Sequence, residues 1–181
     1  MRRYRIAEQG IMPHFVTSTV VRWLPIFTSE PYLKIITDGL QFCREHKGLL
    51  VHGYVVMPTH WHLIGSADEQ HDLSGIMRDF RRHTSKAITS QLEADHNKLF
   101  LYVLGKAAEA QGRTDTKYKV WSDDLHPESL ISERFFLQKL KYVHENPVRK
   151  GLVSKPEHWC YSSARAWIEE VPEPIEIDLL G

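Results

Sequence analysis

Apolar and polar residues in the first third of the chain predict a strand, a helix and a strand pair. Residues 15–21 are rich in β-branched side chains, which favour strands. Over residues 31–48 apolar positions recur at helical spacing, with a proline at the start and a glycine at the end. Residues 49–57 and 60–65 are apolar stretches separated by Pro58-Thr59, which is typical of a tight turn. We therefore expect these two stretches to pair as antiparallel strands.

The middle of the chain predicts a second helix, a less regular segment and a fourth strand. Residues 72–92 carry one continuous apolar stripe, as a helix that covers a sheet does. Residues 93–117 are less regular and could hold a short helix, so we interpret them as a helical or mobile insertion. The short aromatic segment 118–121 is interpreted as the fourth strand.

A last long helix carries two polar residues on one flank. It begins at Ser129 or Ser132, either of which can cap it, and we expect it to end before Pro147. Its core stripe consists of Phe136, Leu140 and Val143. Tyr142 and Asn146 are four residues apart, so they lie one turn apart beside that stripe. A phenol and an amide oxygen can therefore reach the same small volume.

In chain order the predicted elements are strand, helix, two antiparallel strands, helix and strand. This is the order of a ferredoxin-like α+β fold, an RRM-like antiparallel sheet covered by helices. A length of 181 residues is enough for a sizeable core. We expect residues 1–181 to form a single domain, with the insertion at about residues 93–117.

Composition and charge restrict where a partner could bind. Lys plus Arg and Asp plus Glu both number 23, so any nucleic-acid site must be a local patch. One candidate is a basic row at helical spacing on residues 72–92, formed by Arg78, Arg82 and Lys86. Such a row is either a solvated helix face or a face that contacts phosphates. Two cysteines are too few for a disulfide framework. With no apolar run of about 20 residues and no signal-peptide pattern, we expect a cytoplasmic protein with no membrane partner.

Two histidines give the segment 60–65 its chemistry. In a strand, alternation sends His60 and His62 to one face and Trp61 to the other, so both imidazoles point the same way from a rigid support. That geometry suits two ligands of one divalent metal, and Asn146 could supply a third donor. With 11 histidines in the chain, however, a chance His-x-His triplet is common. Tyr142 is either a nucleophile for a bound phosphate or a tyrosine that covers the core edge.

Several motifs in a fixed order resemble those of the REP-associated tyrosine transposases, which are single-tyrosine HUH transposases. The motifs span residues 56–64, 80–85, 121 with 126–127, 141–153 and 161–165, and include Met-Pro-Thr-His-Trp-His and Lys-Tyr-Val-His-Glu-Asn-Pro. The resemblance implies that His60 and His62 are metal ligands, that Asn146 completes the metal site and that Tyr142 is the nucleophile. It also implies a substrate of single-stranded DNA with an imperfect hairpin, cleaved to a 5′-phosphotyrosine and a free 3′-hydroxyl.

The expected cofactor is Mg²⁺ or Mn²⁺, because phosphoryl chemistry favours hard, exchangeable cations. Arg149 and Lys150, close to the tyrosine, are expected to join the basic row in contacting DNA. A tyrosine on a helix flank could also come from a partner subunit, so a homodimer is one expectation. Two further hypotheses stay open: a domesticated hairpin-binding protein with little catalysis, and a metal-dependent phosphoester hydrolase in which Tyr142 is structural.

Overall fold

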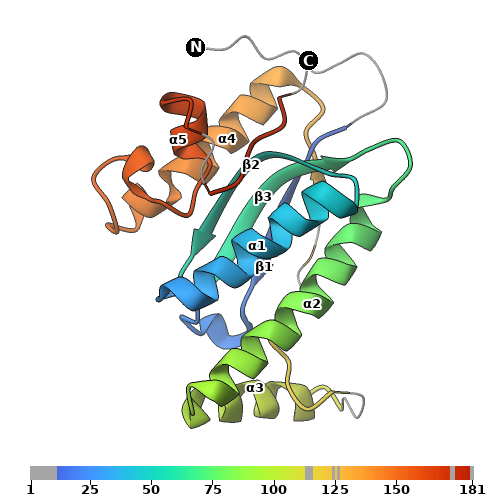
Figure 1. The fold of residues 1–181 in the computed structure, drawn as a ribbon, viewed down its shortest axis with the longest axis vertical. Coiled ribbons are helices and arrows are strands. Elements are labelled where there is room, and N and C mark those ends of the chain that lie inside the picture. The colour runs from blue at the N-terminus through green and yellow to red at the C-terminus, as the bar shows by residue number, and fades with distance from the viewer. Residues whose placement is uncertain (1–11, 113–115, 124, 126, 172–173, 180–181) are drawn as a thin grey trace.

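The computed structural model describes residues 12–112, 116–123, 125, 127–171 and 174–179 (Figure 1). Four strands form one antiparallel sheet with the spatial order β2-β3-β1-β4. The strands are β1 (His14–Thr19), β2 (Leu49–Met57), β3 (His60–Ala67) and β4 (Glu128–Ser129). The helices are α1 (Glu30–His46), α2 (Leu73–Ala94), α3 (Lys98–Glu109), α4 (Glu133–Arg149) and α5 (Ala164–Ile168), with short 3-10 turns η1 (Val21–Trp23) and η2 (Pro156–His158). The predicted α+β class is confirmed.

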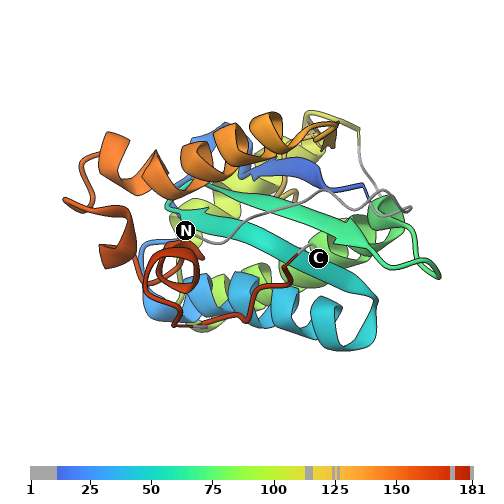
Figure 2. The same cartoon turned by 90° about the horizontal axis from the view of Figure 1, so that it is seen from above.

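The sheet lies between two helical layers. Figure 2 shows α1 and α2 below the sheet and α4 above it. Successive side chains of β3 point to opposite faces of the sheet. Trp61 and Leu63 pack in the core with α1 and α2, and Ile64 packs in the core with α4. The Trp61 indole meets the Phe80 ring of α2 edge to face at a centroid distance of 5.2 Å. The central strand is therefore fixed from both sides.

The β2–β3 hairpin forms as the sequence predicts. Met57 pairs with His60 across a two-residue turn at Pro58 and Thr59. Nearly every residue of both strands is buried, because helices cover the two faces. The hairpin places His60 directly after the turn, at the end of the sheet where β1 also ends.

Helix α4 docks through its apolar stripe. Phe136, Leu140 and Val143 are buried together with Val55 of β2, as predicted. The register of β2 shifts between Val51 and Gly53, and a Cβ atom on Gly53 would lie 2.6 Å from Cδ1 of Leu140. A residue without a side chain at this position therefore allows α4 to approach the sheet closely.

The fourth strand was predicted in the wrong place. Residues 118–121 form only a single bridge, between Trp121 and Val20, and the strand beside β1 is Glu128–Ser129. Lys119, Val120 and Trp121 are all buried in succession, whereas a strand on one face of a core would alternate. The segment instead crosses the end of the sheet: Val21 N–H donates to the Val120 carbonyl at 2.8 Å.

The predicted end of the last helix is also wrong. Ser132 is the cap, since its hydroxyl accepts from the Phe135 N–H at 3.2 Å, and α4 continues through Pro147 to Arg149. A proline removes only its own N–H, so the last turn still closes through the bond from Lys150 N–H to the Asn146 carbonyl at 3.1 Å. The helix thus ends about one turn later than expected.

The less regular segment contains a helix. Within residues 93–117, α3 buries Leu104, Ala107 and Ala108 and packs beside α2. Residues 113–115 of this segment, and His126 of the motif set, lie outside the described residues. Within the described part of the chain, no helix combines the length and the apolar character needed to cross a membrane.

Candidate active site

His60 and His62 lie side by side on β3, on the face that α4 partly covers. Their ring centroids are 4.8 Å apart, and both residues are buried. The shared face follows from the alternation of the strand, as predicted. A strand held between two packed layers gives these imidazoles little freedom to move apart.

A threonine hydroxyl approaches the Nδ1 atom of each histidine. The Thr17 oxygen lies 2.8 Å from Nδ1 of His62, and the Thr59 oxygen lies 3.0 Å from Nδ1 of His60. Where Nδ1 carries the proton and the hydroxyl accepts it, the lone pair is left on Nε2, which is the arrangement of a metal-binding imidazole. Neither contact was predicted from the sequence, although Thr59 adjoins His60 and Thr17 lies in the strand predicted over residues 15–21.

The Nε2 atom of His62 is buried and, among the described residues, has no hydrogen-bond partner. A buried polar atom of this kind calls for a ligand, and two neutral imidazoles suit a divalent cation. The described residues contain no cluster of three or more His, Cys, Asp or Glu side chains that could hold a metal. A further ligand would therefore have to be an amide, a water molecule or the substrate itself.

Burial keeps both imidazoles neutral. It lowers the pKa of His60 to about 4, with a further contribution from the Lys150 charge. It lowers the pKa of His62 to about 3, together with the charges of His60, Arg149 and Lys139. Desolvation and neighbouring cations both disfavour the imidazolium, so each ring can offer a lone pair at neutral pH.

Tyr142 reaches this pair from α4 of the same chain. Its ring centroid is 5.4 Å from that of His62 and 6.0 Å from that of Phe15. The side chain of Tyr142 is 41% exposed, so a substrate can approach it. The Arg149 guanidinium lies 4.3 Å from the centre of the tyrosine ring and donates to the Tyr142 carbonyl at 2.9 Å. No second subunit is needed to bring the phenol to the histidines.

Asn146 is one turn beyond Tyr142 on α4 and is buried, whereas Tyr142 is exposed. The helical spacing of these two residues is as predicted. The role of Asn146 as a third metal ligand stays a prediction.

Three cations surround the histidine pair, on a chain whose formal net charge is zero. Arg149 and Lys150 follow Tyr142 at the end of α4, and their charges reach His62 and His60 respectively. Lys139 lies over the Phe15 ring at 4.5 Å and pairs with Glu128 at 2.6 Å. The local patch that a neutral protein would need for an anionic ligand is therefore present here.

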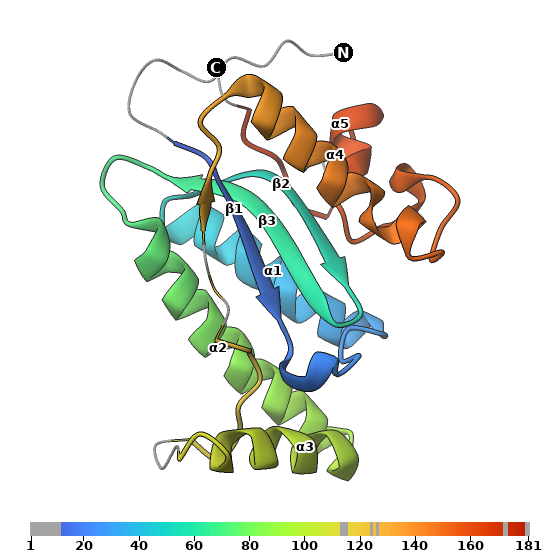
Figure 3. The same ribbon diagram turned by 180° about the vertical axis from the view of Figure 1, so that it is seen from behind.

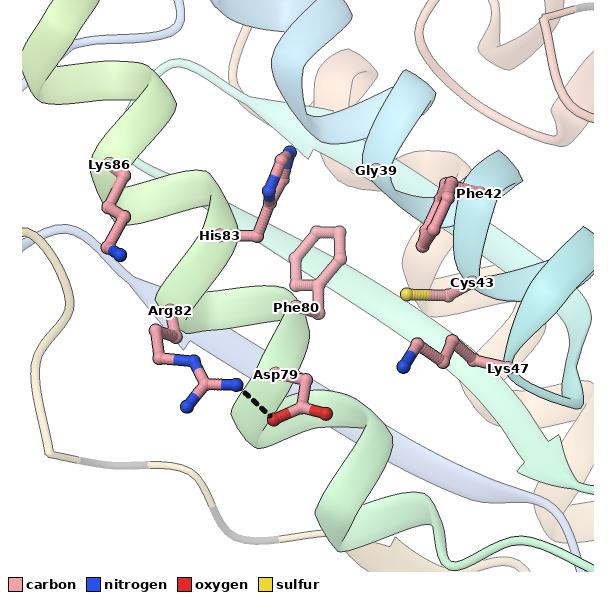
Figure 4. Close-up of a pocket in the computed structure, with 9 residues that line it drawn as sticks. All are labelled: Gly39, Phe42, Cys43, Lys47, Asp79, Phe80, Arg82, His83 and Lys86. Atoms are coloured by element: carbon pink, nitrogen blue, oxygen red, sulfur yellow. Dashed lines mark hydrogen bonds and ion pairs between the residues drawn. The ribbon is translucent and has the colours of Figure 1, made fainter.

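The basic row of Arg78, Arg82 and Lys86 lies elsewhere. Helix α2 packs on the sheet face opposite to α4, and Figure 3 shows α2 behind the strands in the view that has α4 in front. Arg82 pairs with Asp79 at 3.0 Å, and Arg82 and Lys86 line a pocket of about 310 Å³ between α1 and α2 (Figure 4). The structure does not bring this row together with the histidines and Tyr142.

Two solved structures are similar to this protein in fold. No protein-family model matches this sequence, and no curated protein matches it. A REP-associated tyrosine transposase, solved bound to a REP hairpin, is similar over 98% of this chain and 92% of that chain, with a TM-score of 0.58 and 18% sequence identity. A candidate transposase from Deinococcus radiodurans R1 is similar over 81% of this chain and 97% of that chain, with a TM-score of 0.47 and 16% identity. This chain thus has the fold of a REP-associated tyrosine transposase.

The low pKa values predict that the metal-free protein loses stability in mild acid. Below pH 6.5 the unfolded chain gains protons on His60 and His62, but the folded chain does not until about pH 4 and pH 3. The free energy of unfolding should therefore fall between pH 6.5 and pH 5, by about 2 kcal/mol for each histidine. Urea unfolding in EDTA at several pH values measures this dependence.

The double variant His60→Gln with His62→Gln should show a flatter dependence of the free energy of unfolding on pH. Some slope should remain, because burial also lowers the pKa of His52 and of His144. A double variant with the same pH profile as the parent would contradict the assignment of buried, neutral imidazoles.

Proposed function

We propose that the protein is a metal-dependent transposase that cleaves single-stranded, hairpin-bearing repeat DNA through a tyrosine. The observation that carries this proposal is a tyrosine ring 5.4 Å from a buried, neutral histidine whose Nε2 atom lacks a partner among the described residues. The fold likeness to a transposase bound to a REP hairpin supports a DNA hairpin as substrate.

His60 and His62 would hold one divalent cation, Mg²⁺ or Mn²⁺, through Nε2. Asn146 is the proposed third donor. Such a cation, when bound, neutralises charge on the phosphate that is attacked. The hydroxyls of Thr17 and Thr59 orient the two rings, because each lies at hydrogen-bond distance from Nδ1.

Tyr142 would act as the nucleophile. Its phenolic oxygen forms a bond to phosphorus while the bond from phosphorus to the 3′-oxygen breaks. The phenol gives up its proton to solvent, and the 3′-oxygen leaves as a hydroxyl after taking a proton. The phosphotyrosine ester conserves the bond energy, so the reverse attack by a 3′-hydroxyl can rejoin strands. Arg149, Lys150 and Lys139 would neutralise phosphate charge around the site.

Tyr142→Phe should abolish covalent attachment while leaving DNA binding intact. The change removes one oxygen from a residue that is 41% exposed, so stability should change by less than about 1 kcal/mol. Incubated with a DNA hairpin and Mn²⁺, the parent protein should form an adduct that survives denaturant, and the variant should not. Denaturing electrophoresis of a labelled oligonucleotide gives the result.

A matched control is Tyr102→Phe, since Tyr102 is an exposed tyrosine of α3. It should form the adduct at the parental rate. Tight binding by the parent with no adduct would favour the hairpin-binding hypothesis. Cleavage that persists in Tyr142→Phe would make water the nucleophile and favour the hydrolase hypothesis.

His60→Ala with His62→Ala should remove metal binding as well as cleavage. Mn²⁺ affinity, measured by calorimetry or electron paramagnetic resonance without DNA, should fall below detection. Thr17→Val should weaken Mn²⁺ binding by about 10- to 100-fold, because it removes only the hydroxyl that orients His62. His46→Ala is the control, since this histidine is exposed on α1. Parental Mn²⁺ affinity in the double variant would make the metal assignment wrong.

The salt dependence of DNA binding identifies which basic residues contact phosphates. Arg149→Gln with Lys150→Gln should reduce the slope of log affinity against log salt by up to about two, close to one for each lost contact. Neutralising Arg78, Arg82 and Lys86 should reduce it only if DNA also reaches the α2 face. An unchanged slope for those three residues would identify them as a solvated helix face.

A further inference from the structure

An exposed tryptophan borders the candidate active site. Trp23 is 64% exposed, whereas the other four tryptophans, all in the described part of the chain, are buried or half-buried. Its indole meets the His60 imidazole edge to face, with ring centroids 5.9 Å apart and an interplanar angle of 73°. This contact uses little of the indole, so a broad aromatic surface stays open to solvent. Proteins bind unpaired nucleobases by stacking them on surfaces of this kind.

The backbone under Trp23 is both strained and firmly held. Arg22 and Trp23 have φ values of 58° and 54°, in the left-handed region that non-glycine residues disfavour. The turn is nevertheless tied on two sides. Val20 N–H donates to the Thr59 carbonyl at 2.9 Å, next to His60, and Trp23 N–H donates to the Val20 carbonyl at 3.0 Å. Backbone strain that neighbouring bonds maintain in this way is typical of functional positions.

The turn lies where the sheet ends, beside the connection between β2 and β3, as Figure 3 shows. Tyr142 contacts His62, His62 contacts His60, and His60 contacts Trp23, with centroid distances of 5.4, 4.8 and 5.9 Å. The nucleophile and the indole therefore touch different members of the histidine pair. A phosphate held beside the pair by a cation that both imidazoles would bind would have Tyr142 on one side and Trp23 on the other.

We propose that Trp23 stacks on the base of the nucleotide 5′ of the scissile phosphate, the nucleotide that carries the leaving 3′-oxygen. The inference rests on the proposed function. In an in-line displacement the leaving oxygen departs on the side opposite to the nucleophile. Attack from the His62 side then directs the 3′-oxygen towards His60 and Trp23. Stacking would also keep the released 3′-hydroxyl end beside the phosphotyrosine, ready for rejoining.

The test pairs a protein variant with a DNA variant. The scissile phosphate of a hairpin oligonucleotide with single-stranded arms is first located from the strand that the parent protein releases. Affinities are then measured in the Tyr142→Phe background, where the DNA stays uncleaved. Adding Trp23→Gly should weaken binding by about 5- to 150-fold, the range for one lost stacking contact. An abasic nucleotide 5′ of the scissile phosphate should weaken binding of the Tyr142→Phe protein to the same extent.

The decisive result is that the two losses do not add. Protein with Trp23→Gly should bind intact and abasic DNA equally well, because either change alone already removes the stacking contact between indole and base. Additive losses, or losses that fail to add only when the abasic nucleotide lies 3′ of the scissile phosphate, would overturn the inference. If the parent protein releases no strand and forms no adduct, the proposed function fails first, before any Trp23 variant is made, and the inference fails with it.

Three controls separate stacking from effects on folding. Glycine favours a positive φ, so Trp23→Gly should unfold at the parental temperature or above it. Trp23→Phe keeps an aromatic face and should retain most of the affinity and the dependence on the 5′ base. Tyr102→Ala removes an equally exposed ring from α3 and should leave DNA affinity unchanged. A loss of affinity in Trp23→Phe equal to that in Trp23→Gly would also count against stacking.

Discussion

The docking of α4 on the sheet is the contact on which the candidate site depends. Tyr142 comes some 80 residues after the histidines, and only the packing of Phe136, Leu140 and Val143 against the sheet brings the two together. Leu140 approaches β2 at Gly53, where no side chain intervenes. Because packed interiors fix neighbouring elements closely, this contact sets the position of the phenol relative to the imidazoles.

Burial has opposite effects on stability and chemistry at the histidine pair. Removing imidazoles from water leaves polar atoms without full hydrogen bonding, which disfavours folding. The same burial keeps the rings neutral, with pKa values of about 4 and 3, as ligands of a divalent cation must be. The two threonines satisfy Nδ1 and leave Nε2 of His62 without a partner in the described structure. Each ring is thus held through Nδ1, and Nε2 of His62 stays available for a ligand.

Much of this arrangement could be predicted from local pattern. The hairpin of β2 and β3, the α4 stripe and the common face of His60 and His62 follow from periods of 2 and 3.6 residues. The fourth strand could not be found, because Glu128–Ser129 is too short to carry a period and is defined by its pairing with β1. The contact of Thr17 with His62 and the approach of Trp23 to His60 depend on which strands become neighbours. Composition and spacing do not contain that information.

Alternation along β3 also bears on how such a protein can evolve. Trp61 lies between the two histidines in sequence but points into the opposite core, against Phe80 and Trp121. Mutations on that side alter packing without touching the imidazoles, and mutations at the open edge alter contacts to a ligand without touching the core. Core positions and positions at the open edge can therefore change independently of each other. Such independence allows the surface beside the histidines to change its ligand while the packed scaffold persists.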